Sequence, residues 1–278
     1  MPVVSPTTVD DALDTLRDGG EWHLLAGGTD LMVEVNFNHR RPANVLSLGR
    51  IESLRQWRHV GDVVEIGACV TWREMETGPL AELLPALAEA ARTVGSPQIR
   101  AAGTLGGNLG TCSPAGDGLP VLAALDATVH LQSADGERSI GFADFMTGPK
   151  RSVRRPDEIV SRVTVPVTDG WQGYSKVGVR NAMVISIASA CLSVHRGRAR
   201  IALGSVGPTI IRAHAAEEWL AGINAVAARA VTPSVAQEFG RRVADEASPI
   251  DDHRSTAAYR RHAVSVIAAR LLERSTRA

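Results

Sequence analysis

The chain has 278 residues, and its 30 lysines and arginines balance 30 aspartates and glutamates. This length allows two domains or three small ones, and the balanced charge gives no overall field that would favour nucleic acid or an anionic membrane. Three cysteines without a CxxC pair indicate a reducing compartment, and they exclude a disulfide framework and a four-cysteine iron–sulfur site within this chain.

The N-terminal part predicts helices separated by short strands. It has no basic run followed by an apolar stretch, and no run of about 18 apolar residues occurs anywhere, so we expect a cytoplasmic protein without a transmembrane segment. TTVDDALDTLRDGG (7–20) has helical apolar spacing, a Thr or Asp cap and two terminating glycines. WHLLAGGTDLMVEV (22–35) runs from a strand through a glycine turn into a second helix. The patterns then predict strands at 44–48 and 63–70 and one helix at 80–93.

The remainder divides into two regions of different pattern. After a glycine-rich stretch, a short helix is expected around 119–126, followed by strands at 127–133, 137–145 and 158–167. Beyond Gly170, three strands at 171–180, 184–196 and 199–207 precede a region that predicts helices from about residue 213. We place boundaries near Arg58 and Gly170, which gives three units of residues 1–57, 58–169 and 170–278.

Two glycine-rich segments suggest a binding site. LLAGGTDL (24–31), the first glycine loop, joins a strand to a helix, and GTLGGN (103–108), the second glycine loop, follows about 75 residues later. Glycine lets a ligand approach the backbone, and the free amides of a turn and of a helix start bind anions. Either loop alone is equally well explained as a tight turn with a polar cap. Together they suggest an elongated anionic ligand such as a pyrophosphate, although the GxxxxGK[ST] and GxGxxG patterns are absent.

Asp117 follows the second glycine loop and precedes the helix expected at 119–126. Two interpretations of this aspartate stay open. It is either the N-cap of that helix or a carboxylate that accepts hydrogen bonds from ribose hydroxyls, as acidic residues do in other nucleotide sites.

Six segments resemble the flavin-binding subunit of the molybdenum hydroxylases, the family of xanthine dehydrogenase and carbon monoxide dehydrogenase. They are LLAGGTDL, QIRAAGTLGGNLGTCSPAGD, GPKRSVRRPDEIVSRVTVP, YSKVGVR, LGSVGPT and YRRH, and they occur in family order from about residue 24 to 261. The resemblance implies an α+β fold with FAD as cofactor. It further implies a two-part FAD-binding domain of the vanillyl-alcohol oxidase type, formed by the first two units, and a C-terminal domain of a small antiparallel sheet with helices.

The resemblance also implies which residues contact FAD. The two glycine loops face the pyrophosphate from opposite sides, Asp117 lies on the adenosine ribose, Val160 makes an apolar contact, and Lys176 lies beside the flavin. The full set is Leu24, Leu25, Ala26, Gly27, Gly28, Thr29, Asp30, Leu31, Gly103, Thr104, Leu105, Gly106, Gly107, Asn108, Ser113, Asp117, Val160 and Lys176.

Two further expectations concern the neighbourhood of the flavin. Period-two alternation places Tyr174, Lys176, Gly178 and Arg180 on one strand face, where lysine and arginine face either a cavity or solvent. A lysine beside the ring would favour the anionic reduced flavin. Val94 occupies a position where the xanthine dehydrogenase branch has an aromatic, which leaves adenine stacking open.

The resemblance implies an electron-transfer subunit in which the flavin is the reactive group and no side chain is catalytic. The eight histidines show no HExxH spacing, no GxSxG elbow occurs, and no metal site is expected. The expected partners are an iron–sulfur subunit with two [2Fe–2S] clusters and a molybdopterin-binding large subunit, in a dimer of heterotrimers that binds no nucleic acid. Two alternatives stay open: a self-sufficient FAD-dependent oxidase or reductase of the same fold, and an adapter that has lost FAD.

Overall fold

The N-terminal unit is a small parallel sheet with two helices. The computed structural model describes residues 2–39 and 41–277, and its first sheet has the order β1-β3-β2 with all pairs parallel. The strands are β1 (Val3–Val4), β2 (Trp22–Leu25) and β3 (Asn44–Ser47), and the connecting helices are α1 (Val9–Arg17) and α2 (Leu31–Asn36). The Thr8 hydroxyl caps α1 by accepting from the Asp11 amide, so the first predicted helix is confirmed.

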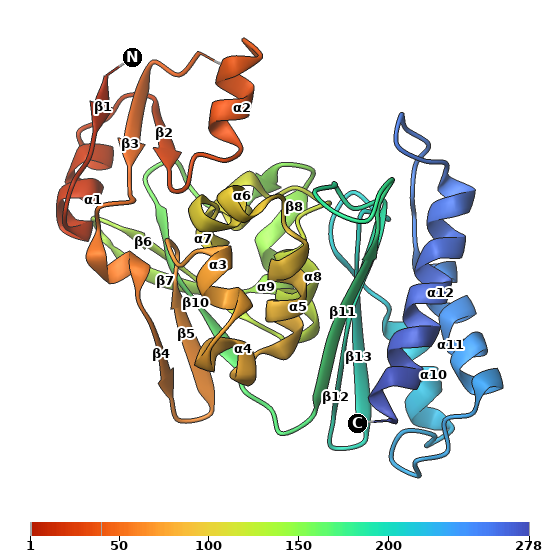
Figure 1. Ribbon diagram of the computed structural model, residues 1–278. Coiled ribbons are helices and arrows are strands. Elements are labelled where there is room, and N and C mark those ends of the chain that lie inside the picture. Colours follow the sequence, from red (N-terminus) through yellow and green to blue (C-terminus); the bar gives the residue numbers. More distant parts are fainter. Residues whose placement is uncertain (1, 40, 278) are drawn as a thin grey trace.

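The second unit is an antiparallel sheet of five strands in the order β4-β5-β10-β6-β7. The strands are β4 (Trp57–Val60), β5 (Val63–Gly67), β6 (Thr128–Ser133), β7 (Gly136–Gly141) and β10 (Ile159–Pro166). Short elements connect them: η1 (Glu52–Arg55), α9 (Phe142–Phe145), β8 (Met146–Gly148) and β9 (Arg151–Ser152). In Figure 1 this sheet lies below the N-terminal sheet and on one side of a central group of helices.

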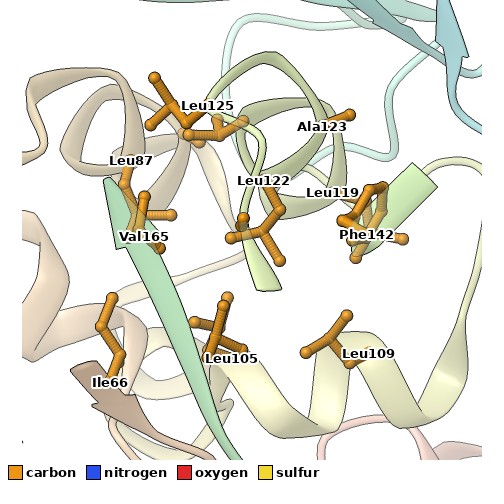
Figure 2. Packing of buried hydrophobic residues seen from close by; sticks show 14 of the residues in the cluster. Ile66, Leu87, Leu105, Leu109, Leu119, Leu122, Ala123, Leu125, Phe142 and Val165 are labelled. Carbon is orange, nitrogen blue, oxygen red and sulfur yellow. The ribbon is translucent and has the colours of Figure 1, made fainter. Parts of the chain in front are cut away.

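The central helices build the main core against the second sheet. They are α3 (Trp72–Glu76), α4 (Pro79–Leu83), α5 (Pro85–Thr93), α6 (Pro97–Ala102), α7 (Leu105–Thr111) and α8 (Gly118–Ala124). Figure 2 shows Leu105 and Leu109 of α7 below the α8 residue Leu122, with the strand residue Ile66 on the other side of Leu105 from Leu109, and all four are fully buried. Burying each such side chain contributes about 2 kcal/mol. The core therefore fixes the start of α7, where the second glycine loop lies.

The C-terminal unit is a four-stranded antiparallel sheet with three helices on its outer face (Figure 1). Its strands are β11 (Trp171–Val177), β12 (Ala188–His195), β13 (Arg198–Gly204) and β14 (Ile211–Arg212), and its helices are α10 (His214–Gly222), α11 (Pro233–Glu246) and α12 (Ala257–Ser275). The inner face packs on α5 and α8. The expected C-terminal sheet with helices is confirmed. No helix in the described part of the chain has the length and apolar character needed to cross a membrane.

Two local expectations about the central helices are wrong. The helix predicted at 80–93 is interrupted, because Pro85 has no amide hydrogen to continue α4 and instead begins α5. The second glycine loop is largely helical, since α7 begins at Leu105 despite the glycines at positions 106 and 107. Its N-cap is Thr104, whose hydroxyl accepts from the Gly107 amide at 3.0 Å.

Candidate functional site

A groove with a volume of about 710 Å³ runs between the three units. Both glycine loops line it, together with the start of β10 and the loop that follows β11. Its inner end is deeply buried, with Leu48, Cys69 and Val160 each 5% exposed or less. At its other end, beside the C-terminal sheet, the apolar side chains of Ile99, Met183 and Ile185 are 37%, 54% and 52% exposed. We call these the inner end and the open end.

The glycines bring the two loops together. A Cβ atom on Gly27 would lie 1.7 Å from the Ala102 carbonyl oxygen, and one on Gly106 would lie 2.5 Å from the Ala68 Cβ. These two glycines are therefore required for contact between chain segments. Gly28 has φ +74°, in the region that glycine adopts without strain, and this lets the first loop turn into α2. The loops thus meet each other as closely as backbones allow while their other side lines the groove.

Most of the residues predicted to contact the cofactor line this groove. All of residues 24–31 do so, and so do Thr104, Gly106, Gly107, Asn108, Ser113, Asp117 and Val160. The other three predicted residues, Gly103, Leu105 and Lys176, do not line the groove. Leu105 points into the core, and Gly103 is held between Trp72 and the α6 backbone. Val94, where the sequence lacks an aromatic, also lines the groove.

Asp117 is the centre of a buried polar cluster. It stands at the N-cap position of α8, but its side chain makes no capping bond. One carboxylate oxygen, Oδ1, accepts from the Tyr174 hydroxyl at 2.8 Å and from the Ser186 hydroxyl at 2.7 Å. Burial and the Asp117 carboxylate hold the pKa of Tyr174 well above its usual value. This hydroxyl therefore stays protonated and is the hydrogen-bond donor to Asp117. Asp117 is therefore the N-cap residue of α8 by position, but its side chain binds within the polar cluster instead of capping the helix.

Lys176 pairs with the other carboxylate oxygen of Asp117. Its ammonium nitrogen lies 2.6 Å from Asp117 Oδ2, 2.9 Å from the Thr93 carbonyl oxygen and 3.1 Å from the Val184 carbonyl oxygen. An ammonium has three hydrogens to donate, and these three oxygens use all of them. The lysine therefore ties together α5, α8 and the loop after β11.

This pairing bears on two of the expectations. Asp117 was assigned to the adenosine ribose and Lys176 to the flavin ring, which are opposite halves of an elongated cofactor. The structure places the two side chains in contact at the open end of the groove. A ligand that contacts one of these side chains therefore lies close to both.

The predicted alternation along 174–180 also fails beyond the strand. β11 ends at Val177, so Gly178 and Arg180 lie in the following loop. Arg180 is exposed and donates to the carbonyl oxygens of Ala182 and Met183 instead of facing a cavity with Lys176. The alternation rule holds only while the strand is hydrogen-bonded to β12, and that pairing stops at Val177.

Two polar atoms of the groove lining are buried without a hydrogen-bond partner. They are Oδ1 of Asn108, on α7, and Nδ1 of His23, on β2. A buried polar atom left without a partner costs about 1–3 kcal/mol, so such atoms in a groove indicate where a ligand makes polar contacts. Asn108 was predicted from the sequence and His23 was not.

Several lining residues escaped the sequence analysis. Arg154 lies between β9 and β10, and Met183, Val184 and Ile185 lie in the loop after β11. None of them belongs to a glycine pattern, and they reach the groove only through the packing of distant segments. Arg154 had one available signal, since it lies within the resembling segment GPKRSVRRPDEIVSRVTVP.

The Cys69 thiol lines the inner end and is expected to be unreactive. Burial raises the pKa of Cys69 and of Cys112 to about 11, so about one such thiol in a thousand is ionised at pH 8. Alkylation by iodoacetamide should be slow at pH 8 and should accelerate about tenfold per pH unit until the pKa is reached. Peptide mass spectrometry measures this rate, with the urea-unfolded chain as control. Rapid labelling of folded Cys69 at pH 7 would contradict the burial argument.

The chain matches two family descriptions that together cover nearly all of it. Residues 1–168 match the FAD binding domain in molybdopterin dehydrogenase, and residues 174–275 match the CO dehydrogenase flavoprotein C-terminal domain. The first match ends shortly before β11, and the second begins within that strand.

Among characterised relatives, the nicotinate dehydrogenase FAD-subunit of Eubacterium barkeri is 34% identical over 232 residues, 78% of each chain. The nicotine 6-hydroxylase medium subunit of Paenarthrobacter nicotinovorans is 33% identical over 265 residues, 92% of this chain and 90% of that one. A solved carbon monoxide dehydrogenase chain from Hydrogenophaga pseudoflava is 27% identical, has a TM-score of 0.91, and is matched over 99% of this chain and 96% of its own. The chain belongs to the family of FAD-binding subunits of molybdopterin dehydrogenases.

Proposed function

We propose that this protein is the FAD-carrying electron-transfer subunit of a molybdopterin-dependent hydroxylase or dehydrogenase. In this role it passes electrons from iron–sulfur clusters of a partner to an external acceptor. The observation that carries the proposal is the groove itself, a cavity of about 710 Å³ beside which the backbones of the two glycine loops meet. Family membership identifies FAD as the cofactor, and we propose the groove as its binding site.

The residues of the groove fit FAD. The glycines of both loops line the groove without a side chain, so a pyrophosphate can approach the backbone there. In the second loop the amides of Gly106 and Gly107 already donate within the fold, so we assign the amide contacts to the first loop. The orphan Asn108 Oδ1 accepts from a hydroxyl donor, and the unpartnered His23 Nδ1 is a further polar contact. Leu24, Leu48 and Val160 supply apolar walls for a ring. Polar groups in the middle and apolar walls at the end match a molecule with a charged centre and flat rings.

Each part of the chain has a separate task in this proposal. The first glycine loop supplies amides for the pyrophosphate, the second lets the pyrophosphate approach its backbone, Asp117 accepts from a polyol hydroxyl of the cofactor, and Lys176 keeps Asp117 and the open end in place. FAD, when bound, supplies the redox chemistry, because the flavin exchanges electrons one or two at a time. The protein holds and positions the flavin.

The partners follow from what the relatives are. The medium and FAD subunits among them belong to multi-subunit molybdenum hydroxylases. We propose that this chain assembles with an iron–sulfur subunit carrying two [2Fe–2S] clusters and a molybdopterin-binding large subunit, as a cytoplasmic dimer of heterotrimers. We also propose that residues 1–57, 58–169 and 170–278 are its domains. The first two would form an FAD-binding fold of the vanillyl-alcohol oxidase type, since the sheets follow these ranges except that β4 of the second sheet begins at Trp57.

The test is an absorption spectrum of the purified chain, followed by denaturation and identification of the released flavin. About one FAD per chain is expected. The loaded chain should reduce artificial acceptors only slowly by itself and should gain activity when the partner subunits are added. Rapid turnover of a small substrate by the isolated chain would instead identify a self-sufficient flavoenzyme. A colourless chain that binds no added FAD, alone or with its partners, would contradict the proposal.

A further inference from the structure

Arg154 is the one lysine or arginine among the described residues that line the groove. The acidic residues Glu21, Asp30 and Asp117 also line it, and Lys176 neutralises Asp117 from behind. Neither glycine loop contains a cation. The positive charge at the groove wall therefore comes from Arg154 alone among these residues, and its role is separate from that of the glycine loops.

The segment after β9 holds the Arg154 head group in place. Its Nη1 atom donates to the carbonyl oxygen of Arg155 at 2.8 Å and to that of Glu158 at 2.7 Å. The nearby carboxylates of Asp157 and Glu158 pair with Arg138 and Arg155 instead. In the described structure, no ion pair joins Arg154 to a carboxylate, so its remaining N–H groups stay available. The guanidinium is held by its own loop and presented to the groove.

Arg154 belongs to the inner end. The residues that follow its hydrogen-bonded loop are Ile159 and Val160. Ile159 packs in one buried cluster with Leu48 and Cys69, and Val160, Leu48 and Cys69 all line the groove. His23, with its unpartnered Nδ1, is on the neighbouring strand β2 beside Leu24 of the same cluster. One cation and one orphan ring nitrogen thus face a mostly apolar, buried compartment.

The two ends of the groove suit different halves of FAD. The isoalloxazine ring must exchange electrons with other molecules, so it fits the open end, where Met183 and Ile185 are about half exposed. The pyrophosphate between the loops then leaves the adenine for the inner end. Adenine offers ring-nitrogen acceptors and an amino donor, and a guanidinium both donates to such acceptors and stacks on aromatic faces.

We propose that Arg154 holds the adenine ring of FAD at the inner end and thereby selects FAD over FMN. The inference rests on the proposed function, since it assumes that the groove takes a flavin dinucleotide. Arg154 contacts the cofactor through the N–H groups or the flat face that its own loop leaves free. Its contribution is then absent for any ligand that lacks the adenosine half.

The test compares three ligands on the full chain after removal of its flavin. Dissociation constants for FAD, FMN and ADP are measured by calorimetry for the parent protein, for Arg154→Gln and for Arg151→Gln. The control removes the same charge from an exposed position of the neighbouring strand β9, outside the groove lining. Arg154→Gln should weaken FAD and ADP binding about ten- to hundredfold and leave FMN binding unchanged. Arg151→Gln should match the parent protein for all three.

Unchanged FAD and ADP binding by Arg154→Gln would overturn the inference. Equal losses for FAD and FMN would also overturn it, because they place the contact on the flavin half. If Arg154→Gln does not fold, Arg154→Lys, which keeps the charge but not the planar fork, should still bind ADP several-fold more weakly with unchanged FMN binding. A parent protein that binds none of the three ligands would contradict the proposed function, an outcome separate from an effect confined to Arg154.

Discussion

Replacing Lys176 with methionine is expected to destabilise the protein by about 3–5 kcal/mol, because it leaves the Asp117 carboxylate buried without its cation. The two side chains are only 7% and 9% exposed. The same change also removes the hydrogen bonds from Lys176 to the carbonyl oxygens of Thr93 and Val184. These bonds hold two walls of the groove together at its open end. We therefore expect Lys176→Met to lose FAD during purification. Urea unfolding and the flavin content per chain measure the two effects.

Lys150→Met is the matched control for this prediction. Lys150 also forms an ion pair, 2.8 Å from Glu34, but its side chain is 59% exposed, and such pairs contribute about 1 kcal/mol or less. The double variant Asp117→Asn with Lys176→Met should recover part of the stability lost in the single variant, since it removes both buried charges. If Lys176→Met and the parent protein have the same urea midpoint of unfolding, the ammonium is not what stabilises Asp117.

Replacing Gly27 with alanine is expected to separate the two glycine loops. The new Cβ atom would lie 1.7 Å from the Ala102 carbonyl oxygen, and a backbone atom does not move aside as a flexible side chain does. Overpacking of this severity costs about 3 kcal/mol. Because both loops line the groove, the shift that relieves the overlap also changes the distance between the two loop backbones. FAD affinity should fall at least tenfold, as measured by flavin fluorescence quenching.

Gly222→Ala is the control for that experiment. Gly222 is exposed at the end of α10, away from the groove, and nothing lies within 4 Å of its Cβ position. Alanine favours a helix over glycine by up to about 1 kcal/mol, so this variant should be as stable as the parent or slightly more stable, with the same FAD affinity. A Gly27→Ala protein that kept the parent's FAD affinity would show that the loops need not touch.

The sequence predicted elements well wherever local chemistry decides them. The Thr8 cap and the apolar spacing after it set α1, and period-two strands such as β6 and β10 were expected at their observed places. It failed where packing overrides propensity. Three glycines argue against a helix at 105–111, yet α7 forms there because Leu105 and Leu109 are buried and Gly106 fits against Ala68.

The same distinction applies to the site. Residues within the two loops carry a local pattern, so their place along the groove followed from the glycines. Lys176 was expected at a ligand but lies behind Asp117, since only the folded chain shows which oxygen atoms surround its ammonium. Arg154 and His23 have no pattern of their own, and their position depends on how β2 and the segment before β10 meet.

The carboxylate of Asp117 has a consequence for how such proteins diversify. Asp117 belongs to the segment matched by the FAD binding domain, whereas Tyr174, Lys176 and Ser186 lie beyond it in the C-terminal unit. The interface between the two modules therefore forms part of the groove wall. A chimera that exchanges the C-terminal module between relatives should keep its flavin only when the incoming module brings a hydroxyl, an ammonium and a second hydroxyl to the same carboxylate. Exchange of the C-terminal module is then restricted by the side chains of Tyr174, Lys176 and Ser186, even where the residues on the protein surface differ between relatives.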